Sequence, residues 1–301
     1  MIFRYFILLL SIVLLNGSCV SPSSKKAPPP KIKTKKVEVR HSPLLWEIKR
    51  DNFPTSYILG TIHLGVAASE LDPVIWKYFK ISKQIVLEAD ILSADPRKIK
   101  KSILLPRFKK LQSMLTKEEW LTLIARLPNI PPKVLNRMNP YGVLNQLQRD
   151  SLPNHKSMDQ VFHEKAKEQH KSTIFLESID FQLNLLKSLF TIQDLKHGLK
   201  FKFEPKKEVE KFRKLYLGGN SQKIYDAIVN PSTKQIKMNP KNISKLLDNR
   251  NRNWSTILEP ILRRESTFIA VGAGHLAGKN GVLMLLNNRG FKTTRYTHEK
   301  P

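Results

Sequence analysis

Two histidines occupy closely matched sequence frames near opposite ends of the chain. His63 lies in Gly60-Thr-Ile-His-Leu64 and His275 in Gly272-Ala-Gly-His-Leu276, each after a run of β-branched and aromatic residues. Such runs predict buried strands, and the glycines allow a sharp turn and a close approach to a ligand. Either histidine alone could simply cap its strand, but the matched pair favours a functional site, because imidazoles bind metals and transfer protons.

Acidic side chains are predicted at the same kind of position. Glu88 and Asp90 follow the apolar run that starts at Gln84, and Glu177 follows the run that starts at Ser172. In open α/β sheets, ligands bind at the carboxyl edge of the strands. We therefore expect these carboxylates and the two imidazoles to converge on one edge of a sheet.

This set of side chains is suited to hydrolysis. Two imidazoles with one or two carboxylates are typical ligands of a divalent metal, which lowers the pKa of bound water to about 7. Without a metal, a His–Glu pair could still act as a general base on water. The sequence has no Gly-x-Ser-x-Gly elbow, His-Glu-x-x-His helix or phosphate-binding loop, so the commonest hydrolase and nucleotide-binding classes are not indicated.

The elements that must position these residues can be predicted in chain order. The runs 44–48 and 56–60 predict a hairpin that leads into the first histidine frame. Apolar residues at helical spacing predict a helix over 71–79, and 84–90 predicts the next strand. A strand, helix, strand unit of this kind predicts that its two strands are parallel neighbours.

Residues 95–247 form a mainly helical middle segment in this prediction. Thr116 with Glu119 is typical of a capping box at a helix start, and helices are also expected over 157–167 and 181–190. The very basic stretch 196–211 is predicted to be a surface connection. After a helix over 248–262 come the second histidine strand, a helix over 281–288 and a last strand over 291–297. The fold class predicted is mixed α/β, with a central, mostly parallel sheet, helical layers and a single domain over 44–301.

The start of the sequence predicts export. Arg4, the short apolar run 5–15 and Cys19 fit a signal peptide over 1–18, because the run is too short for a membrane span of roughly 20 residues. Cys19 is the only cysteine, which excludes an intrachain disulfide, and its position after Gly-Ser predicts a lipidated residue that anchors an exported protein to the bacterial membrane. Plain secretion and an uncleaved anchor are the alternatives. Residues 19–43 are expected to be a disordered, basic tether.

The charge balance is strongly basic, with 52 Lys and Arg against 25 Asp and Glu and a net charge of +27. The basic residues are spread along the chain and no basic-aromatic module stands out, so no nucleic-acid partner is expected. Anionic lipid, cell-wall polymer or a generally Lys-rich proteome would each account for the charge.

Several stretches together resemble the TraB/GumN family, which includes the Tiki metalloproteases and pheromone-shutdown proteins. The stretches in chain order are Leu45-Trp46, Ser56 to Gly65, Val86 to Asp90, Ser157 to Gln160, Leu176-Glu177 with Gln182-Leu183, Arg250 to Trp254 and Val271 to Gly278. The resemblance covers about 44–296. It implies an α/β fold related to the erythromycin esterase and ChaN group.

The resemblance also implies a site. Its metal ligands would be His63, Glu88 and His275, holding a divalent ion such as Mn, Co or Zn, and Glu88, Glu177 and Arg250 would be catalytic. The leading hypothesis is thus an envelope-tethered, metal-dependent hydrolase that acts on a peptide or a small molecule. The alternative is a non-catalytic lipoprotein that binds a peptide or small ligand in the same pocket.

Other polar residues have two interpretations. Asp159 could cap a helix or belong to the site, and Arg250 could be a solvated helix charge or an anion clamp. His155, His163, His170 and His197 are predicted at the surface, and Trp46, Trp120 and Trp254 in the core. Glu88 is expected to contact the metal directly, whereas Glu177 could be a ligand, a supporting residue or a general base.

Overall fold

The computed structural model describes residues 42–149, 155–200, 205–230 and 239–298. The predicted signal peptide, Cys19 and all of the predicted tether up to residue 41 lie outside the described residues. No helix within the described ranges is both long enough and apolar enough to cross a membrane.

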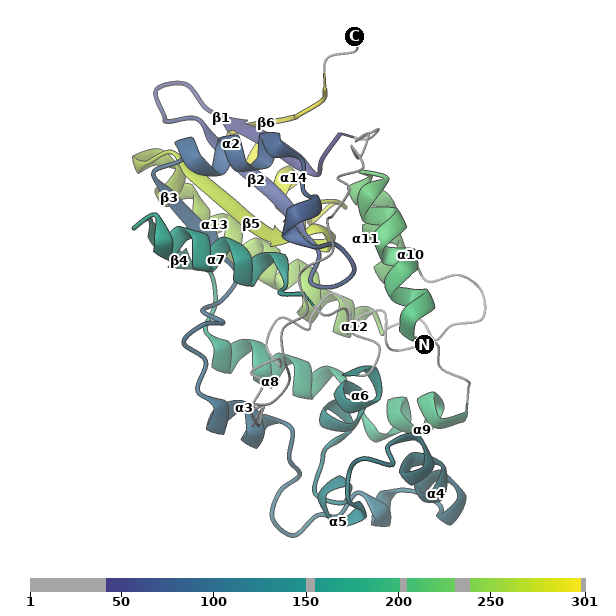
Figure 1. The fold of residues 1–301 in the computed structure, drawn as a ribbon. Helices are drawn as coiled ribbons and strands as arrows, with labels where there is room; N and C mark the ends of the chain where they lie inside the picture. The colour runs from purple at the N-terminus through teal and green to yellow at the C-terminus, as the bar shows by residue number, and fades with distance from the viewer. Residues whose placement is uncertain (1–41, 150–154, 201–204, 231–238, 299–301) are drawn as a thin grey trace, which may run out of the picture.

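Six strands form one sheet in the order β4-β3-β5-β2-β1-β6 (Figure 1). Strands β4, β3, β5 and β2 are parallel, while β1 is antiparallel to both β2 and β6. The strands are β1 Leu45–Lys49, β2 Ser56–Thr61, β3 Gln84–Leu87, β4 Ser172–Phe175, β5 Thr267–Gly272 and β6 Lys292–Arg295. The predicted mixed α/β class with a mostly parallel sheet is therefore confirmed.

One predicted strand pairing is wrong. The hairpin of β1 and β2 is present, but β2 and β3 are not neighbours, because β5 lies between them. Ile269 of β5 pairs with Ile58 on one side and with Val86 on the other. Every residue of β5 is buried, and a strand that is apolar on both faces is most stable in the centre of a sheet, where helices cover it on both sides.

Helices cover both faces of the sheet. Helices α2 (Pro73–Ile81) and α7 (Met158–Glu168) lie over one face, and α13 (Asn249–Arg264) and α14 (Val282–Asn287) lie over the other (Figure 1). Phe79, Phe162 and Phe268 meet beneath the first pair, with ring centroids 5.4 to 5.6 Å apart. This aromatic contact fixes α2 and α7 against the central strand.

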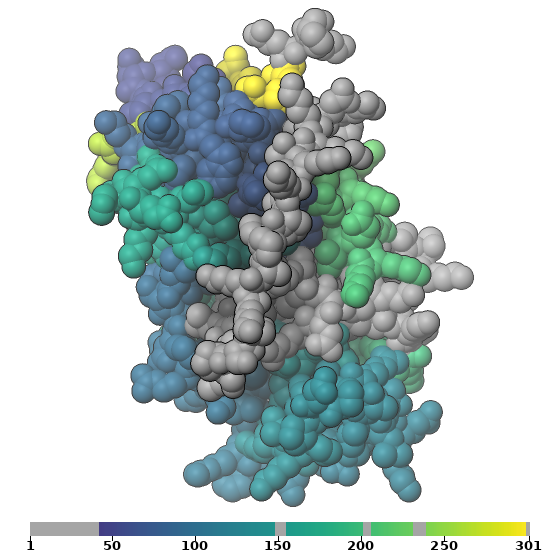
Figure 2. All heavy atoms as spheres, in the orientation of Figure 1, coloured from purple at the N-terminus to yellow at the C-terminus, as the bar shows by residue number. Residues whose placement is uncertain are grey.

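The middle segment is mainly helical, as predicted, and much of it lies beyond the carboxyl edge of the parallel strands (Figure 1). In Figure 2 the teal-blue atoms at the bottom are part of this segment and lie below the purple and blue atoms of the sheet layer, while its green helices lie to the right. Besides α7, its described α-helices are α3 Pro96–Ser102, α4 Lys117–Arg126, α5 Pro132–Leu135, α6 Pro140–Arg149, α8 Ile179–Leu189, α9 Ile192–Lys200, α10 Pro205–Leu217, α11 Ser221–Val229 and α12 Pro240–Ile243. The capping box of Thr116 and Glu119 is confirmed.

The basic stretch 196–211 is not the surface connection that the sequence predicts. Its described residues belong to helices α9 and α10. The apolar side chains of Leu195, Leu199, Phe212 and Tyr216 are buried, while many of the lysines between them face solvent. The helical periodicity is weak in this stretch, because these helices bury only a narrow apolar stripe and most of their other residues are charged.

Candidate functional site

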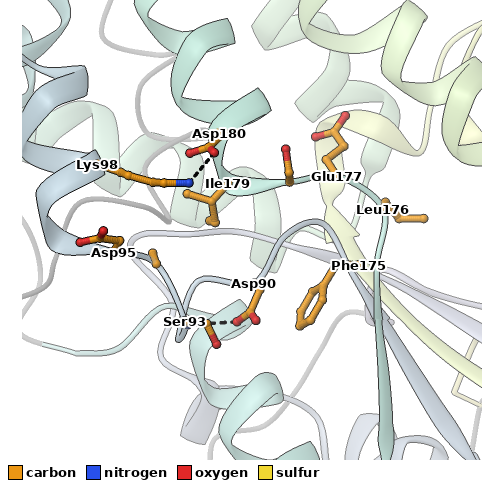
Figure 3. A pocket seen from close by; sticks show the side chains of 11 residues that line it. Asp90, Ser93, Asp95, Lys98, Phe175, Leu176, Glu177, Ile179 and Asp180 are labelled. Atoms are coloured by element: carbon orange, nitrogen blue, oxygen red, sulfur yellow. Dashed lines mark hydrogen bonds and ion pairs between the residues drawn. The ribbon is translucent and has the colours of Figure 1, made fainter.

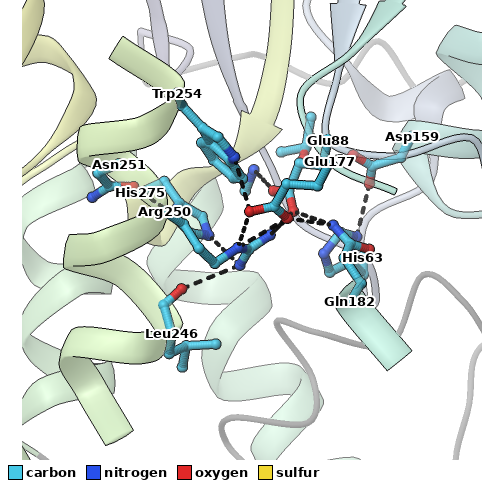
Figure 4. Close-up of polar contacts among 12 residues, drawn as sticks. His63, Glu88, Asp159, Glu177, Gln182, Leu246, Arg250, Asn251, Trp254 and His275 are labelled. Carbon is cyan, nitrogen blue, oxygen red and sulfur yellow. Dashed lines mark hydrogen bonds and ion pairs between the residues drawn. The ribbon is translucent and has the colours of Figure 1, made fainter. Parts of the chain in front are cut away.

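Four polar side chains converge at the carboxyl edge of the sheet (Figure 4). His63 follows β2, Glu88 follows β3, Glu177 follows β4, and His275 ends a 3-10 turn directly after β5. The two histidines are buried, and the side chains of Glu88 and Glu177 are only 11% and 5% exposed. The structure thus brings together four of the five strand-end residues that the sequence selects, all except Asp90, and their roles stay a prediction.

The glycines of the two histidine frames are required by close packing. The backbone N–H of Gly272 donates to Oε1 of Glu88 at 2.8 Å, and a Cβ on Gly272 would lie 3.2 Å from that oxygen. A Cβ on Gly60 would lie 2.8 Å from Cδ1 of Leu276 and 3.1 Å from Ala273. The two frames therefore pack against each other, and Gly272 also holds the glutamate in place.

Arg250 lies at the centre of the cluster. From the first turn of α13 its Nε donates to Oε1 of Glu177 at 2.9 Å, and its Nη2 donates to both Glu177 and Glu88 at 2.8 Å. Burial would lower the pKa of Arg250, but the two glutamates outweigh it and raise the pKa, so the guanidinium stays charged. Arg250 is therefore not the solvated helix charge that the sequence left open.

Other side chains hold this ion-pair network in place. Trp254 donates from Nε1 to Oε1 of Glu177 at 3.0 Å, and its ring lies under the guanidinium at 4.6 Å. Gln182 donates to Oε2 of both glutamates at 3.3 Å. Because buried carboxylates are stable only when they are paired and hydrogen-bonded, these contacts support the buried charges.

His275 is oriented from both sides of its ring. Its Nε2 lies 3.1 Å from Nη1 of Arg250, and its Nδ1 lies 2.6 Å from Oδ1 of Asn251. Asn251 in turn donates to the carbonyl of Asn280 at 2.8 Å. Burial, followed by the nearby charges of Arg250 and His63, holds the pKa of His275 well below its usual value, so this imidazole is neutral.

His63 has the opposite electrostatic environment. Its Nδ1 lies 2.7 Å from Oδ2 of Asp159, whose Oδ1 accepts from Thr61 at 3.2 Å. Burial lowers the pKa of His63, but the charge and hydrogen bond of Asp159 outweigh it, and the net pKa is raised. The cap of α7 is Ser157, so Asp159 belongs to the site and not to the helix cap.

Two of the three donors predicted to bind a metal are already bonded to Arg250, which donates to Oε2 of Glu88 and lies 3.1 Å from Nε2 of His275. Asp159 holds the third, His63, through Nδ1. Within the described parts of the chain, no group of three or more His, Cys, Asp or Glu side chains is arranged to hold a metal ion. With the guanidinium of Arg250 bonded to both Glu88 and His275, these two side chains do not fit a metal in this arrangement.

Two cavities lie on either side of Glu177. One of about 560 Å³ is bordered by Asp90, Asp180 and Lys98 (Figure 3), and one of about 470 Å³ lies between α8 and α13 and is bordered by Arg250. Asp90 does not join the central cluster, since its carboxylate accepts from the backbone of Ser93 at 3.1 Å. A ligand in the first cavity would contact the cluster at Glu177, and a ligand in the second would contact it at Glu177 or Arg250.

The sequence did not assign Thr61, Gln182, Asn251 or Trp254 to polar roles in the site. Trp254 was expected to be a core anchor, and it is fully buried as predicted, but it also bonds Glu177. The signal that was available is helical spacing. Residue 254 is four positions after 250 and three after 251. All three therefore lie on one face of α13, which is directed toward the sheet edge.

One of three comparisons with known proteins gives a match. A profile of the TraB/PrgY/gumN family matches residues 44–295. The chain belongs to this family. Neither the search of curated proteins nor the search of solved structures found a match. Family membership covers the whole sheet and every residue of the cluster, and so agrees with the family resemblance of the sequence.

Proposed function

We propose that this chain of the TraB/PrgY/gumN family is a hydrolase whose reaction centre is the buried cluster at the carboxyl edge of the sheet. The observation that carries the proposal is the pair of imidazoles in opposite environments. Asp159 raises the pKa of His63, whereas burial and Arg250 lower the pKa of His275. Titratable groups whose pKa values are pushed apart in one site are typical of acid–base catalysis.

In this proposal His63 acts on water. Asp159 holds Nδ1 of His63, so proton transfer takes place at Nε2. Neutral His63 removes a proton from water as the water oxygen attacks the carbonyl carbon of an amide or ester. The proton then passes from His63 to the departing amine or alcohol as the carbon–nitrogen or carbon–oxygen bond breaks, which leaves a carboxylic acid as the second product.

The remaining residues position the reactants. Arg250 borders the 470 Å³ cavity and supplies positive charge at its wall, where charge developing on the substrate oxygen is stabilised. Glu88 and Glu177 fix the guanidinium from two directions. The substrate would be a peptide or small molecule that enters beside Glu177.

Turnover by the purified chain tests the proposal. Peptides and esters would be incubated with the wild type, with His63→Asn and with His170→Asn, and products would be detected by mass spectrometry. His170 is exposed in the turn after α7, so His170→Asn is a matched control. We expect His63→Asn to lower turnover by about 100-fold or more and the control to be unaffected. Equal turnover by all three proteins would contradict the proposal.

The second candidate function is ligand binding without turnover. It is favoured by the 470 Å³ cavity, which Phe181, Leu185 and three asparagines border on the outer side of Arg250. In that case a ligand would bind the wild type and His63→Asn equally and would be recovered unchanged.

The proposal includes export and attachment to a membrane through lipidated Cys19, on the sequence pattern at the start of the chain. Mass spectrometry of the protein from membrane fractions would test it. A lipidated Cys19 as the first residue is expected, and an intact Met1 or an unmodified Cys19 would contradict it.

A further inference from the structure

The position between Glu88, Glu177 and His275 is occupied by a cation that belongs to the chain itself. Nη2 of Arg250 lies 2.8 Å from Oε2 of each glutamate, and Nη1 lies 3.1 Å from Nε2 of His275. Two carboxylate oxygens and one imidazole nitrogen thus point at one guanidinium (Figure 4). The same three atoms are the hard and intermediate ligands that divalent metals prefer.

Arg250 is held there by its own helix. A π-helical turn, Ser244–Asp248, comes directly before α13, and such turns are frequent at functional sites. The carbonyl of Leu246 in this turn accepts from Nη1 of Arg250 at 3.2 Å. With Trp254 stacked against it, the guanidinium has acceptors around its whole edge, so it cannot leave without breaking several bonds.

The charges show why the position needs a cation. Both glutamates are almost fully buried, and two buried carboxylates this close repel each other strongly unless a positive charge lies between them. A guanidinium provides one charge and planar donors. A divalent ion could provide the charge instead, at about 2.0–2.2 Å from each ligand, but it could not occupy this position together with the guanidinium.

We propose that Arg250 is the resident cation of this site and excludes divalent metals, and that its removal creates a metal site with Glu88, Glu177 and His275 as ligands. The inference concerns metal binding and not turnover, so its test does not depend on the hydrolase proposal. It differs from the metal site that the sequence predicts, because Glu177 replaces His63 among the ligands.

The test is metal binding by chelator-treated full-length protein, with Zn²⁺ and Co²⁺ as probes in calorimetry and visible absorption. We expect Arg250→Ala to bind one equivalent at least about tenfold more tightly than the wild type, because two buried carboxylates are then unpaired. Arg252→Ala is the matched control, since the exposed side chain of Arg252 bonds Asn249 and not the glutamates or His275 in the described contacts, and this variant should bind metal like the wild type. Adding His275→Ala to Arg250→Ala should abolish the gain.

Tight metal binding by the wild type would overturn the inference. If one equivalent of Zn²⁺ or Co²⁺ binds the wild type as tightly as it binds Arg250→Ala, the guanidinium does not exclude metals. If Arg250→Ala does not fold, Arg250→Gln replaces it, because glutamine keeps much of the side-chain volume without the charge. A folded Arg250→Gln that binds metal no better than the wild type would also overturn the inference.

Discussion

Arg250 donates a hydrogen bond to Nε2 of His275, and this contact fixes the tautomer of the histidine. A guanidinium can only donate, so Nε2 must accept and the proton of the neutral ring lies on Nδ1, where it is donated to Asn251. The proton position of a buried imidazole is thus set by two residues that are adjacent on α13.

The first prediction follows from this tautomer. Asn251→Leu removes the acceptor and leaves the Nδ1–H of His275 without a partner, which costs about 1–3 kcal/mol of the free energy of unfolding. Urea unfolding would measure the cost, and ¹⁵N spectra of the ring would show whether the proton moves to the other nitrogen. A ring spectrum and a stability both equal to wild type would refute the assignment.

The second prediction concerns pH and the Asp159–His63 pair. The pKa of His63 in the folded protein is above its usual value, so its contribution to stability is fully present below the unfolded pKa and is lost as pH rises through the folded pKa. Asp159→Asn should therefore destabilise the protein more at about pH 5.5 than at about pH 9. The same variant should lower the pKa of His63 in an NMR titration.

If Asp159→Asn had the same cost at both pH values, the charge of Asp159 would not be what raises the pKa of His63. Glu164→Gln on the outer face of α7 serves as the control, because its carboxylate pairs with the exposed Lys156. Its effect on stability should be small, within about 1 kcal/mol.

The third prediction separates the two glutamates. Glu177 accepts from Arg250 and Trp254, whereas Glu88 accepts from Arg250 and the backbone of Gly272. Glu177 accepts hydrogen bonds from two nitrogens of the guanidinium and Glu88 from one. Glu177→Gln should therefore lower the free energy of unfolding by about 3–5 kcal/mol, more than Glu88→Gln does. Urea unfolding of both variants provides the comparison.

The pairing of Glu177 with Arg250 can be checked with a double variant. Arg250→Met added to Glu177→Gln should recover part of the lost stability, because it removes a buried charge that has lost a partner. Strictly additive losses would show that the two side chains do not act as a pair.

The fourth prediction tests the tight packing of the second histidine frame. Gly272→Ala places a methyl group 3.2 Å from Oε1 of Glu88 and 3.6 Å from Cδ2 of His275. We expect a cost of about 1–3 kcal/mol and a shift in the His275 ring signals, because the crowded carboxylate must move. Gly290→Ala is the control, because at a φ of +82 an alanine is strained and its Cβ would lie next to Arg50 and not next to the cluster. This variant should lower stability without moving those signals.

The elements that carry the site were more predictable from the sequence than their order in the sheet. The matched glycine frames indicated both histidine strands, because short buried strands with a following glycine have a clear pattern. The position of β5 between β2 and β3 could not be predicted, since strand order depends on how strands and helices from distant parts of the chain pack together. A local pattern of strand, helix and strand does not contain that information.

The partners of the site residues were also hard to predict. Asp159 was recognised only as a candidate, because an acid near a helix start is most often a cap, and the cap here is Ser157. Helical spacing places Asn251 on the same face as Arg250, but nothing in the sequence identifies an imidazole as its partner. Such pairs join residues from distant elements, and only the packing of α7 and α13 on the sheet brings them together.

The central place of β5 determines when this protein can fold during its synthesis. Strands β2 and β3 are made early, but their shared neighbour is made only after the entire helical segment, and β6, the partner of β1, is later still. Until then, both strands expose unpaired edges that can join other chains. We expect a nascent chain interrupted before residue 267 to be prone to aggregation and to depend on a chaperone, because the contacts that complete the sheet are among the most distant in the sequence.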